Sequence, residues 1–413
     1  MPVGDLVDWL DEQGGPGSVW YVKRLSGNDT LANGSHQAGP YIPRDFLFSI
    51  YPLLNRREIK NPDVRFRLYV DSHADCREIR AVWYNNRFHD SSAARGRDEA
   101  RLTGFGGGAS ALLDPESTGA LTVFAFRGGG GAEIPDCHVW VCRHGTEEDL
   151  VENRVGPVEP GRWVLWPPAQ TGFFPLLEPE GKATPAKYVI PLEWRLAFPS
   201  GAEIIQQAVA LRPDHGLDPD RRLLRRRECE FELFREVEQA VEMPLIAAGF
   251  PTIDAFIARA QTILQRRKAR SGRSLELHTK AIFVEERLVE GRHFAHQPEA
   301  ENGKRPDFLF PSGEAYRDLS FPRGRLRMLG VKTTCRDRWR QVLSEADRIP
   351  NKHLLTLQEG ISEGQFREMT QAGVQLVVPA GLFSSFPRPV QPHLQTLESF
   401  IADVRLLNAD LAP

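Results

Sequence analysis

Residues 326–334 read LRMLGVKTT, an apolar run that one lysine, Lys332, interrupts. A short run of this kind predicts a buried strand, and a lysine inside it is costly to bury unless it is paired or in use. A second apolar run, DFLF, begins at Asp307, and Glu345 follows Lys332 by thirteen positions (345 − 332) near the end of a predicted helix. The stretch therefore predicts a sheet that carries two carboxylates and a lysine.

The sequence around this stretch alternates between helical and strand-like spacing of apolar residues. The predicted helices are 203–211, 221–248, 253–264, 274–288, 337–347, 362–371 and 393–409. The predicted strands are 307–310, 326–334, 353–357 and 374–379. Helices and strands that alternate in this way predict an α/β domain with a central mixed sheet.

The first 172 residues follow a different pattern, in which short apolar runs are separated by Gly, Pro, Asn and Asp. The predicted strands are 19–25, 64–70, 78–84, 120–126, 138–142 and 162–166. They predict an all-β barrel or pseudobarrel. A chain of 413 residues is long for one core, so we predict two domains, 1–172 and 203–413, joined by a Pro- and Gly-rich segment over 173–202.

Composition and motifs exclude several classes of protein. No apolar run approaches the ~20 residues that a membrane span needs. The start, MPVGDLVDWLDEQ, is acidic and amphipathic, unlike a signal peptide, so we expect a cytoplasmic protein. The glycine-rich loops lack the Lys-Ser/Thr of a P-loop, so we expect no nucleotide cofactor. Cys137 and Cys142 fall on opposite faces of a predicted strand, which argues against a zinc site.

The net charge of −3 argues against a nucleic-acid binder, but the basic residues are clustered. Phosphate binding depends on local potential, so a near-neutral total does not exclude it. For either cluster alone, a solvated helix face is the favoured interpretation. The clusters are Arg221, Arg222, Arg225, Arg226 and Arg227, and Arg266, Arg267, Lys268, Arg270 and Arg273.

Asp307, Lys332 and Glu345 carry the predicted chemistry. Phosphodiester hydrolysis needs a hard cation on oxygen ligands and stabilisation of the pentavalent phosphate. Two carboxylates supply ligands for Mg²⁺, and the lysine orients water or offsets developing charge. Glu276 is a candidate fourth member. It is predicted in the first turn of the helix 274–288, where a carboxylate also complements the helix dipole and need do nothing more.

Two further groups are candidates for contacting DNA bases. Arg336, Asp337 and Arg338 follow Lys332 at the start of a predicted helix. Arginine binds guanine O6 and N7, and aspartate accepts from cytosine N4, although a surface ion pair is the alternative interpretation. Arg227 and Phe231 share a predicted helix face and could sandwich an extruded base. From spacing alone, core packing of Phe231 is favoured.

Several long motifs resemble those of the EcoRII-type restriction endonucleases, over nearly the whole chain. In the first half these motifs are YVKRLSGNDT, HQAGPYIP, DPESTGALT and WVCRHGTEEDL, with FPSGAEIIQ at the junction. In the second half they are RRKARSGRSLELH, RPDFLFPS, MLGVKTTCRDRWRQ and LTLQEG. The resemblance implies an N-terminal effector domain and a C-terminal nuclease domain of the PD-(D/E)XK restriction-endonuclease-like fold.

The resemblance also implies roles for the nuclease residues. The family's active-site positions are matched by Glu276, Asp307, Lys332 and Glu345, and the three carboxylates are the implied Mg²⁺ ligands. The segment that reads the outer C·G pairs of CCWGG is matched by Arg336, Asp337 and Arg338. Arg336 stands where the family carries lysine, and the two are not equivalent in geometry, so its role in base reading or catalysis stays open. Arg227 and Phe231 match the pair that stacks the flipped central base, with Phe231 in place of a tyrosine. Both strands are expected to be cut before the first cytosine.

For the N-terminal domain, the resemblance implies a site that binds a second copy of the sequence. When unoccupied, this domain is expected to cover the nuclease cleft. The matching effector residues are His36, Tyr41, Arg95, Arg97, Glu99 and Arg101. Ala100 stands where lysine is expected, so one phosphate contact is expected to be missing. Without the resemblance, a solvated loop is the favoured interpretation of ARGRDEAR (94–101).

We therefore predict a homodimeric type IIE restriction enzyme that acts on double-stranded DNA at CCWGG. A dimer is expected because one active site cuts one strand and a pseudo-palindromic target calls for two-fold symmetry. Two alternatives stay open at this stage. One is a sequence-specific DNA-binding protein with an inactive nuclease domain. The other is a nuclease of the same fold with a different, for example methylation-dependent, specificity.

Overall fold

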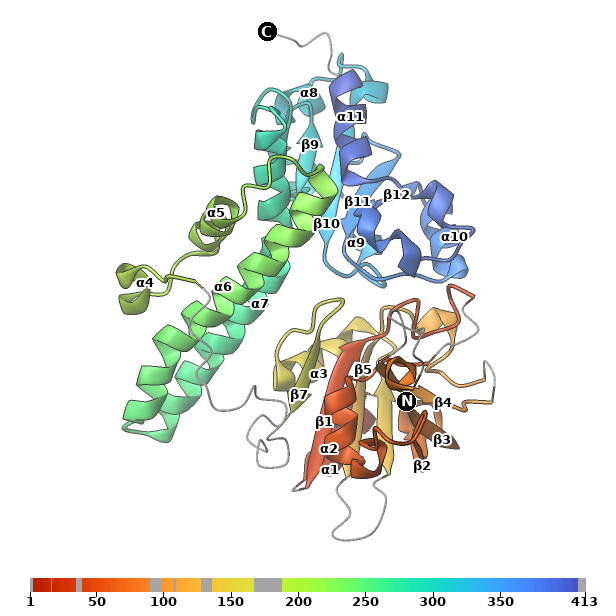
Figure 1. The fold of residues 1–413 in the computed structure, drawn as a ribbon. Coiled ribbons are helices and arrows are strands. Elements are labelled where there is room, and N and C mark those ends of the chain that lie inside the picture. Colours follow the sequence, from red (N-terminus) through yellow and green to blue (C-terminus); the bar gives the residue numbers. More distant parts are fainter. Residues whose placement is uncertain are drawn as a thin grey trace. The chain divides into compact units, whose positions relative to one another are not determined.

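The computed structural model describes residues 3–15, 17–34, 39–89, 98–106, 109–127, 136–166 and 188–407. The chain divides into two compact units (Figure 1). The N-terminal unit comprises residues 1–183, 358–365 and 385–389, and the C-terminal unit comprises residues 184–357, 366–384 and 390–413. No helix in the described ranges is both long and apolar enough to cross a bilayer.

The N-terminal unit is built on one seven-stranded sheet with the strand order β4-β3-β2-β6-β5-β1-β7. Its neighbours pair antiparallel, except for the parallel pair β2–β6. The strands are β1 Ser18–Arg24, β2 Asp63–Val70, β3 Asp75–Tyr84, β4 Glu99–Thr103, β5 Leu121–Arg127, β6 Cys137–Val141 and β7 Trp163–Trp166. The six predicted strands are confirmed, and β4 is an addition.

The prediction that this unit is all-β is wrong, because three helices pack on its sheet. They are α1 Val3–Gln13, α2 Arg44–Ile50 and α3 Gly145–Val155. On one face, Tyr21 of β1 stacks on Phe46 of α2 with ring centroids 5.6 Å apart. On the other face, Trp20 joins a core with Leu6 of α1 and Val151 of α3. Every residue of β1 is buried because both faces of the strand are covered.

The alternation of side chains along a strand also determines which face of the sheet each cysteine near β6 occupies. Cys137 is the first residue of β6, and Cys142 directly follows its last residue. Cys137 belongs to the core that contains α2, and Cys142 belongs to the core that contains α1 and α3. The two thiols therefore lie on opposite faces of the sheet, as the spacing predicted, and cannot share a zinc ion.

The C-terminal unit holds a five-stranded mixed sheet with the order β12-β11-β10-β9-β8, which confirms the predicted α/β architecture. Strands β10, β11 and β12 are parallel to one another. Strand β9 pairs antiparallel with β10 on one side and with β8 on the other. The strands are β8 Ala295–His296, β9 Phe308–Phe310, β10 Arg327–Lys332, β11 Lys352–Thr356 and β12 Val374–Val377. The shorter helices are α8 Gly313–Arg317, α9 Trp339–Leu343, α10 Glu363–Gln371 and α11 Leu397–Leu407.

Before this sheet come α4 Leu192–Leu196, α5 Gly201–Leu211, α6 Pro219–Ala248 and α7 Ile253–Glu285. Helix α7 is continuous, although the sequence predicted two helices with a break near residue 270. Glu276 consequently lies nine residues before the end of α7 (285 − 276), and not in a first turn. The helix-dipole interpretation of Glu276 is therefore wrong, because the dipole's positive end is at Ile253.

Helices α6 and α7 run side by side as a long hairpin (Figure 1) that is held by buried ion pairs. Three glutamates of α6 are at most 5% exposed and face arginines of α7. The shortest N–O distances are 3.0 Å for Glu230–Arg270, 2.6 Å for Glu238–Arg267, 2.6 Å for Glu242–Arg259 and 2.8 Å for Glu242–Arg266. A carboxylate can be buried in such a hairpin because arginine provides both charge and hydrogen bonds.

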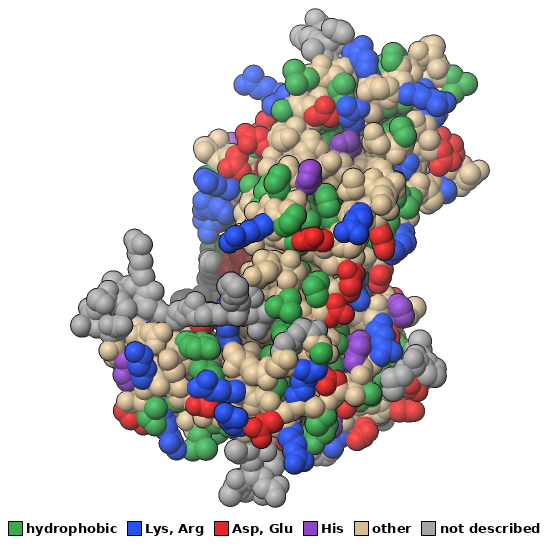
Figure 2. Space-filling view, turned by 90° about the vertical axis from the view of Figure 1, so that its right-hand side faces the viewer, with side chains coloured by type: hydrophobic (Ala, Val, Ile, Leu, Met, Phe, Trp, Pro, Cys, Tyr) green, Lys and Arg blue, Asp and Glu red, His purple; other side chains and the backbone are tan. Residues whose placement is uncertain are grey.

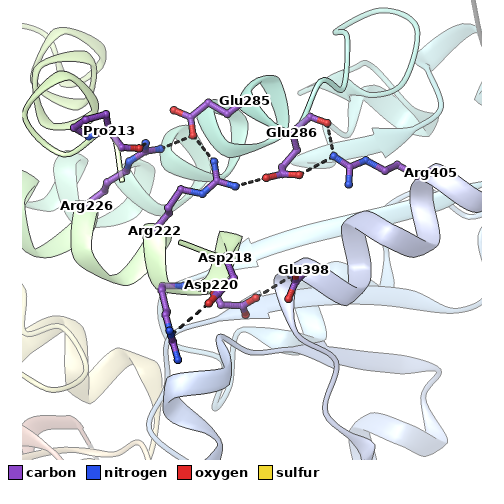
Figure 3. Close-up of polar contacts among 10 residues, drawn as sticks. Pro213, Asp218, Asp220, Arg222, Arg226, Glu285, Glu286, Glu398 and Arg405 are labelled. Carbon is purple, nitrogen blue, oxygen red and sulfur yellow. Dashed lines mark hydrogen bonds and ion pairs between the residues drawn. The ribbon is translucent and has the colours of Figure 1, made fainter. Parts of the chain in front are cut away.

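The basic cluster at the start of α6 is likewise engaged inside the unit, as Figure 3 shows. The fully buried Arg226 and the nearly buried Arg222 both contact the Glu285 carboxylate, each at 2.8 Å. Arg222 also pairs with Glu286, which holds Arg405 of α11 at 2.7 Å. Interpreting the two basic clusters as solvated helix faces is thus wrong for these arginines, because glutamates of a neighbouring helix neutralise them.

On the face shown in Figure 2, acidic and basic side chains are interspersed over both units and do not gather by sign. This agrees with the net charge of −3 and with the internal pairing of many arginines.

We predict that Glu242→Gln destabilises the C-terminal unit by about 1–3 kcal/mol, because Arg259 and Arg266 lose the carboxylate that they share. Both arginines stay partly hydrated, which limits the loss. The measurement is urea unfolding at pH 7, followed by far-UV circular dichroism.

The matched control is Glu368→Gln, since Glu368 pairs with Arg340 at 2.8 Å while both side chains are more than half exposed. An exposed pair of this kind contributes about 0–1 kcal/mol. Equal losses in the two variants would show that the α6–α7 ion pairs contribute no more than a surface pair.

Candidate active site

Asp307 and Lys332 meet because β9 and β10 are antiparallel neighbours. Asp307 directly precedes β9, and Lys332 is the last residue of β10. The Asp307 Oδ2 atom accepts a hydrogen bond from the Val331 backbone N–H at 2.7 Å and one from Lys332 Nζ at 3.3 Å. The carboxylate is thus fixed by the backbone of one strand and by the side chain that ends it.

Burial raises the pKa of Asp307 above its usual value, although the Lys332 charge and the Val331 N–H act in the opposite direction. The nearby Glu276 carboxylate adds to the rise. Asp307 therefore sits where a second negative charge is unfavourable and an additional cation is favourable.

Glu345 lies two residues beyond the end of α9 and completes this site. Burial raises its pKa to about 7, with the Lys332 charge opposing the rise and the Asp307 charge adding to it. Its Oε2 atom is buried and has no hydrogen-bond partner among the described residues. A buried carboxylate oxygen without a donor is unfavourable in the protein alone and is suited to a cation.

Glu276 reaches the same place from α7. It is 6% exposed, and its Oε1 atom accepts hydrogen bonds from His296 Nε2 and from Gln297 Nε2, the latter at 2.7 Å. Its charge acts on Asp307. The structure thus brings the four predicted active-site residues, Glu276, Asp307, Lys332 and Glu345, to one region of the C-terminal unit.

The carboxylates do not form a ready-made cage. Within the described ranges, no group of three or more His, Cys, Asp or Glu side chains is close enough to hold a metal ion. Asp307 and Glu345, with the unpartnered Glu345 Oε2, nevertheless suit Mg²⁺, which usually binds proteins through one or two carboxylates and keeps several waters.

The residues predicted to read the outer base pairs lie just beyond β10. Arg336, Asp337 and Arg338 form the turn between β10 and α9, and Asp337 and Arg338 are exposed. The turn therefore leaves Asp337 and Arg338 accessible to solvent a few residues after Lys332 in the sequence.

The predicted base-stacking pair lies on α6. Arg227 is 6% exposed, with Nη1 3.8 Å from Glu230 Oε2. Phe231 is partly buried, and the Arg270 guanidinium of α7 lies 4.9 Å from its ring centroid. Phe231 therefore has a guanidinium neighbour from the other helix of the hairpin.

In the N-terminal unit, Tyr41, Glu99 and Arg101 lie together. Tyr41 is 41% exposed and forms a β-bridge with Arg101 of β4, whose Nε is 3.3 Å from Glu99 Oε1. Burial and the Glu99 charge raise the pKa of Tyr41. Ala100 is fully buried between them in β4. His36, Arg95 and Arg97 lie outside the described residues.

The sequence did not single out His296 and Gln297, which contact Glu276. His296 is the second residue of β8 and Gln297 follows it, and a two-residue strand is too short for an alternating pattern to predict. Their closeness to Glu276 arises only when β8 pairs with β9.

Comparison with known proteins gives a consistent assignment. Residues 14–170 match the family described as "Restriction endonuclease EcoRII, N-terminal", and residues 234–401 match "EcoRII C terminal". Over 407 residues the chain is 44% identical to "Type II restriction enzyme EcoRII" of Escherichia coli, covering 98% of both sequences.

Two solved structures show weaker likeness. "Metal-depleted Ecl18kI in complex with uncleaved, modified DNA" matches with a TM-score of 0.43 and 17% identity, over 54% of this chain and 85% of that one. The UbaLAI restriction endonuclease B3 domain with cognate DNA matches with a TM-score of 0.26 and 15% identity, over 39% of this chain and 98% of that one. At these values the likenesses do not by themselves assign a fold.

We predict that Glu345→Gln changes the pH dependence of stability in the metal-free protein. Glu345 has a pKa of about 7 in the folded state, above the value of about 4.3 for an unfolded chain. The folded protein therefore binds this proton more tightly, and the stability that it contributes is present below about pH 4.3 and lost as the pH rises through 7.

Urea unfolding in EDTA between pH 4.5 and 8 measures this effect. The stability of the wild type relative to Glu345→Gln should fall across that range and then level off. A difference independent of pH would show that Glu345 ionises normally in the folded protein.

Proposed function

The chain belongs to the EcoRII family of type II restriction enzymes, and from this premise we propose that it is a Mg²⁺-dependent type IIE endonuclease. It hydrolyses both strands of double-stranded DNA at CCWGG before the first cytosine. The reaction class is supported by the likeness to a type II restriction enzyme over 98% of the chain. The location of the active site is supported by the closeness of Asp307, Lys332 and Glu345.

Asp307 and Glu345 are the proposed Mg²⁺ ligands, with Glu276 as the third carboxylate of the site. Mg²⁺ held by these residues would stabilise negative charge on the phosphate and would make a water more acidic. Lys332 holds its ammonium group beside Asp307, where it can offset charge that develops on the phosphate. Because the Val331 N–H and Lys332 both bind Asp307 Oδ2, this ligand is oriented before DNA arrives.

Asp337 and Arg338 are the proposed readers of the outer C·G pairs, with Arg336 beside them. The exposure of Asp337 and Arg338 in the turn after Lys332 supports this role, because side chains that read base edges must be accessible to DNA. Arg227 and Phe231 are proposed to stack the flipped central base. The Arg270 guanidinium beside Phe231 supports a stacking platform at that position.

The N-terminal sheet is proposed to be an effector pseudobarrel that binds a second CCWGG copy and restrains the nuclease when it is unoccupied. Tyr41, Glu99 and Arg101 lie together on one side of β4, which supports a shared contact surface. We propose a homodimer as the active form, because each chain offers one site and two strands are cut.

The first test is digestion of an unmethylated plasmid with several CCWGG sites, with and without Mg²⁺, followed by sequencing of the ends. We expect Mg²⁺-dependent fragments that end before CCWGG. Lys332→Ala should lower the rate by at least about 10²-fold, since the lysine acts on charge in the transition state.

The outcomes separate the alternatives. Discrete cuts elsewhere, or cuts that depend on methylation, would keep the active site and refute the proposed specificity. Tight specific binding without any cleavage would support the inactive-nuclease alternative. A plasmid with one site should be cut more slowly than one with several if the effector domain needs a second copy.

We predict that Arg338→Ala weakens cleavage at CCWGG by about 1–3 kcal/mol, equivalent to roughly 5- to 150-fold in kcat/KM, because a bidentate contact to guanine is lost. Discrimination against sites altered in the outer C·G pair should fall by a similar factor.

Arg340→Ala is the control, since Arg340 is exposed two residues further along and pairs with Glu368 on the surface. It should change kcat/KM by less than about threefold. Equal effects of the two substitutions would argue for general electrostatics in place of base reading.

A further inference from the structure

The Glu276 carboxylate, at the proposed active site, is held by a segment to which no role has been assigned. Both donors to its Oε1 atom come from consecutive residues, His296 and Gln297. The same segment is tied to the other carboxylate, because the Gln297 backbone N–H donates to the Asp307 backbone carbonyl at 3.0 Å. Residues 296–297 therefore connect Glu276 to Asp307.

The local backbone of this segment is unusual. Gln297 has a φ of +48°, in the left-handed region that non-glycine residues seldom adopt. In this conformation its backbone N–H bonds Asp307 while its side chain turns to Glu276. Strained conformations of this kind persist where the surrounding contacts determine them and are concentrated at functional sites.

Lys280 fixes the proton of His296. Lys280 Nζ lies 3.4 Å from His296 Nδ1 and 2.9 Å from the Glu290 carboxylate. An ammonium group only donates hydrogen bonds, so Nδ1 accepts and the ring proton is on Nε2. His296 is thereby set as a donor to Glu276. Its ring is also fixed by packing on Phe308, with centroids 5.3 Å apart.

We propose that His296 is a positioning residue for Glu276, with Gln297 as its partner and Lys280 as the group that selects its tautomer. The two donors occupy Oε1, so only Oε2 of Glu276 is available to a cation or water beside Asp307. The proposal rests on the proposed function, since Glu276 acts in the site only if this chain is a metal-dependent nuclease. Hydrogen-bonded partners of this kind orient ligating carboxylates in metal sites generally.

The test compares His296→Leu, which removes the donor, with His296→Gln, which keeps one near the Nε2 position. The first readout needs no turnover: the rise in melting temperature when Ca²⁺ is titrated into the protein. The second is the Mg²⁺ concentration that gives half-maximal plasmid cleavage. Metal-free binding of a CCWGG duplex serves as a check on the fold.

For His296→Leu we expect about a 10- to 100-fold higher cation requirement in both titrations, with metal-free DNA binding unchanged. His296→Gln should restore the requirement to within about threefold of the wild type. Lys280→Met, in a side chain that is 30% exposed, should give an intermediate increase, because Nε2 then no longer carries the proton in every molecule.

His293→Leu is the matched control, because His293 lies three residues earlier and accepts from the Val289 backbone without contacting Glu276. It should leave both titrations unchanged. A lower melting temperature of His296→Leu with an unchanged cation requirement would overturn the proposal and leave His296 a purely structural partner. If His296→Leu fails to fold, Lys280→Met and His296→Gln still decide the matter. A wild type that neither responds to cations nor cleaves DNA would refute the proposed function itself.

Discussion

The burial of carboxylate groups is the constraint on which the C-terminal unit depends. Each buried carboxylate must be matched by donors or cations, because an uncompensated charge in a protein interior is very unfavourable. Glu242 is matched by two arginines of α7. Asp220, whose pKa is raised by burial, is matched by backbone N–H groups of Ala380, Leu397 and Glu398, and so joins α6 to the start of α11 (Figure 3). These contacts organise the helices around the sheet.

In the proposed active site, the buried carboxylates are matched less completely by donors and cations. Asp307 has two donors on one oxygen, yet burial still raises its pKa. Glu345 has a buried oxygen without a hydrogen-bond partner among the described residues, and its pKa rises to about 7. At Glu242 and Asp220 such a deficit is met by arginine or by backbone N–H groups. At Glu345 a cation held jointly with Asp307 would meet it, which supports the proposed site.

The same constraint explains how a chain of net charge −3 can carry so many clustered arginines. Those of α6 and α7 largely serve the fold, since Arg222, Arg226, Arg267 and Arg270 bind glutamates of the neighbouring helix. The number of clustered arginines in a sequence is therefore larger than the number that the folded protein leaves available to bind phosphate. Exposed basic residues in turns, such as Arg338, are better candidates for contact with DNA.

The sequence by itself determined the strands of both sheets except β4 and β8, the α/β character of the second half and the four candidate residues of the proposed site. It could do so because alternation and helical spacing are local properties and a lysine inside an apolar strand is conspicuous. It did not determine the helices on the N-terminal sheet, the continuity of α7 or the partners of Glu276. Helix α7 runs through Ser271-Gly272 because ion pairs to α6 hold it before this pair, at Arg267 and Arg270, and after it, at Glu285. Helix propensity does not contain this effect. His296 lies twenty residues after Glu276, and it reaches this carboxylate, together with Gln297, only through the pairing of β8 with β9. Only the tertiary structure could decide such contacts, since they depend on burial and on donors supplied by distant parts of the chain.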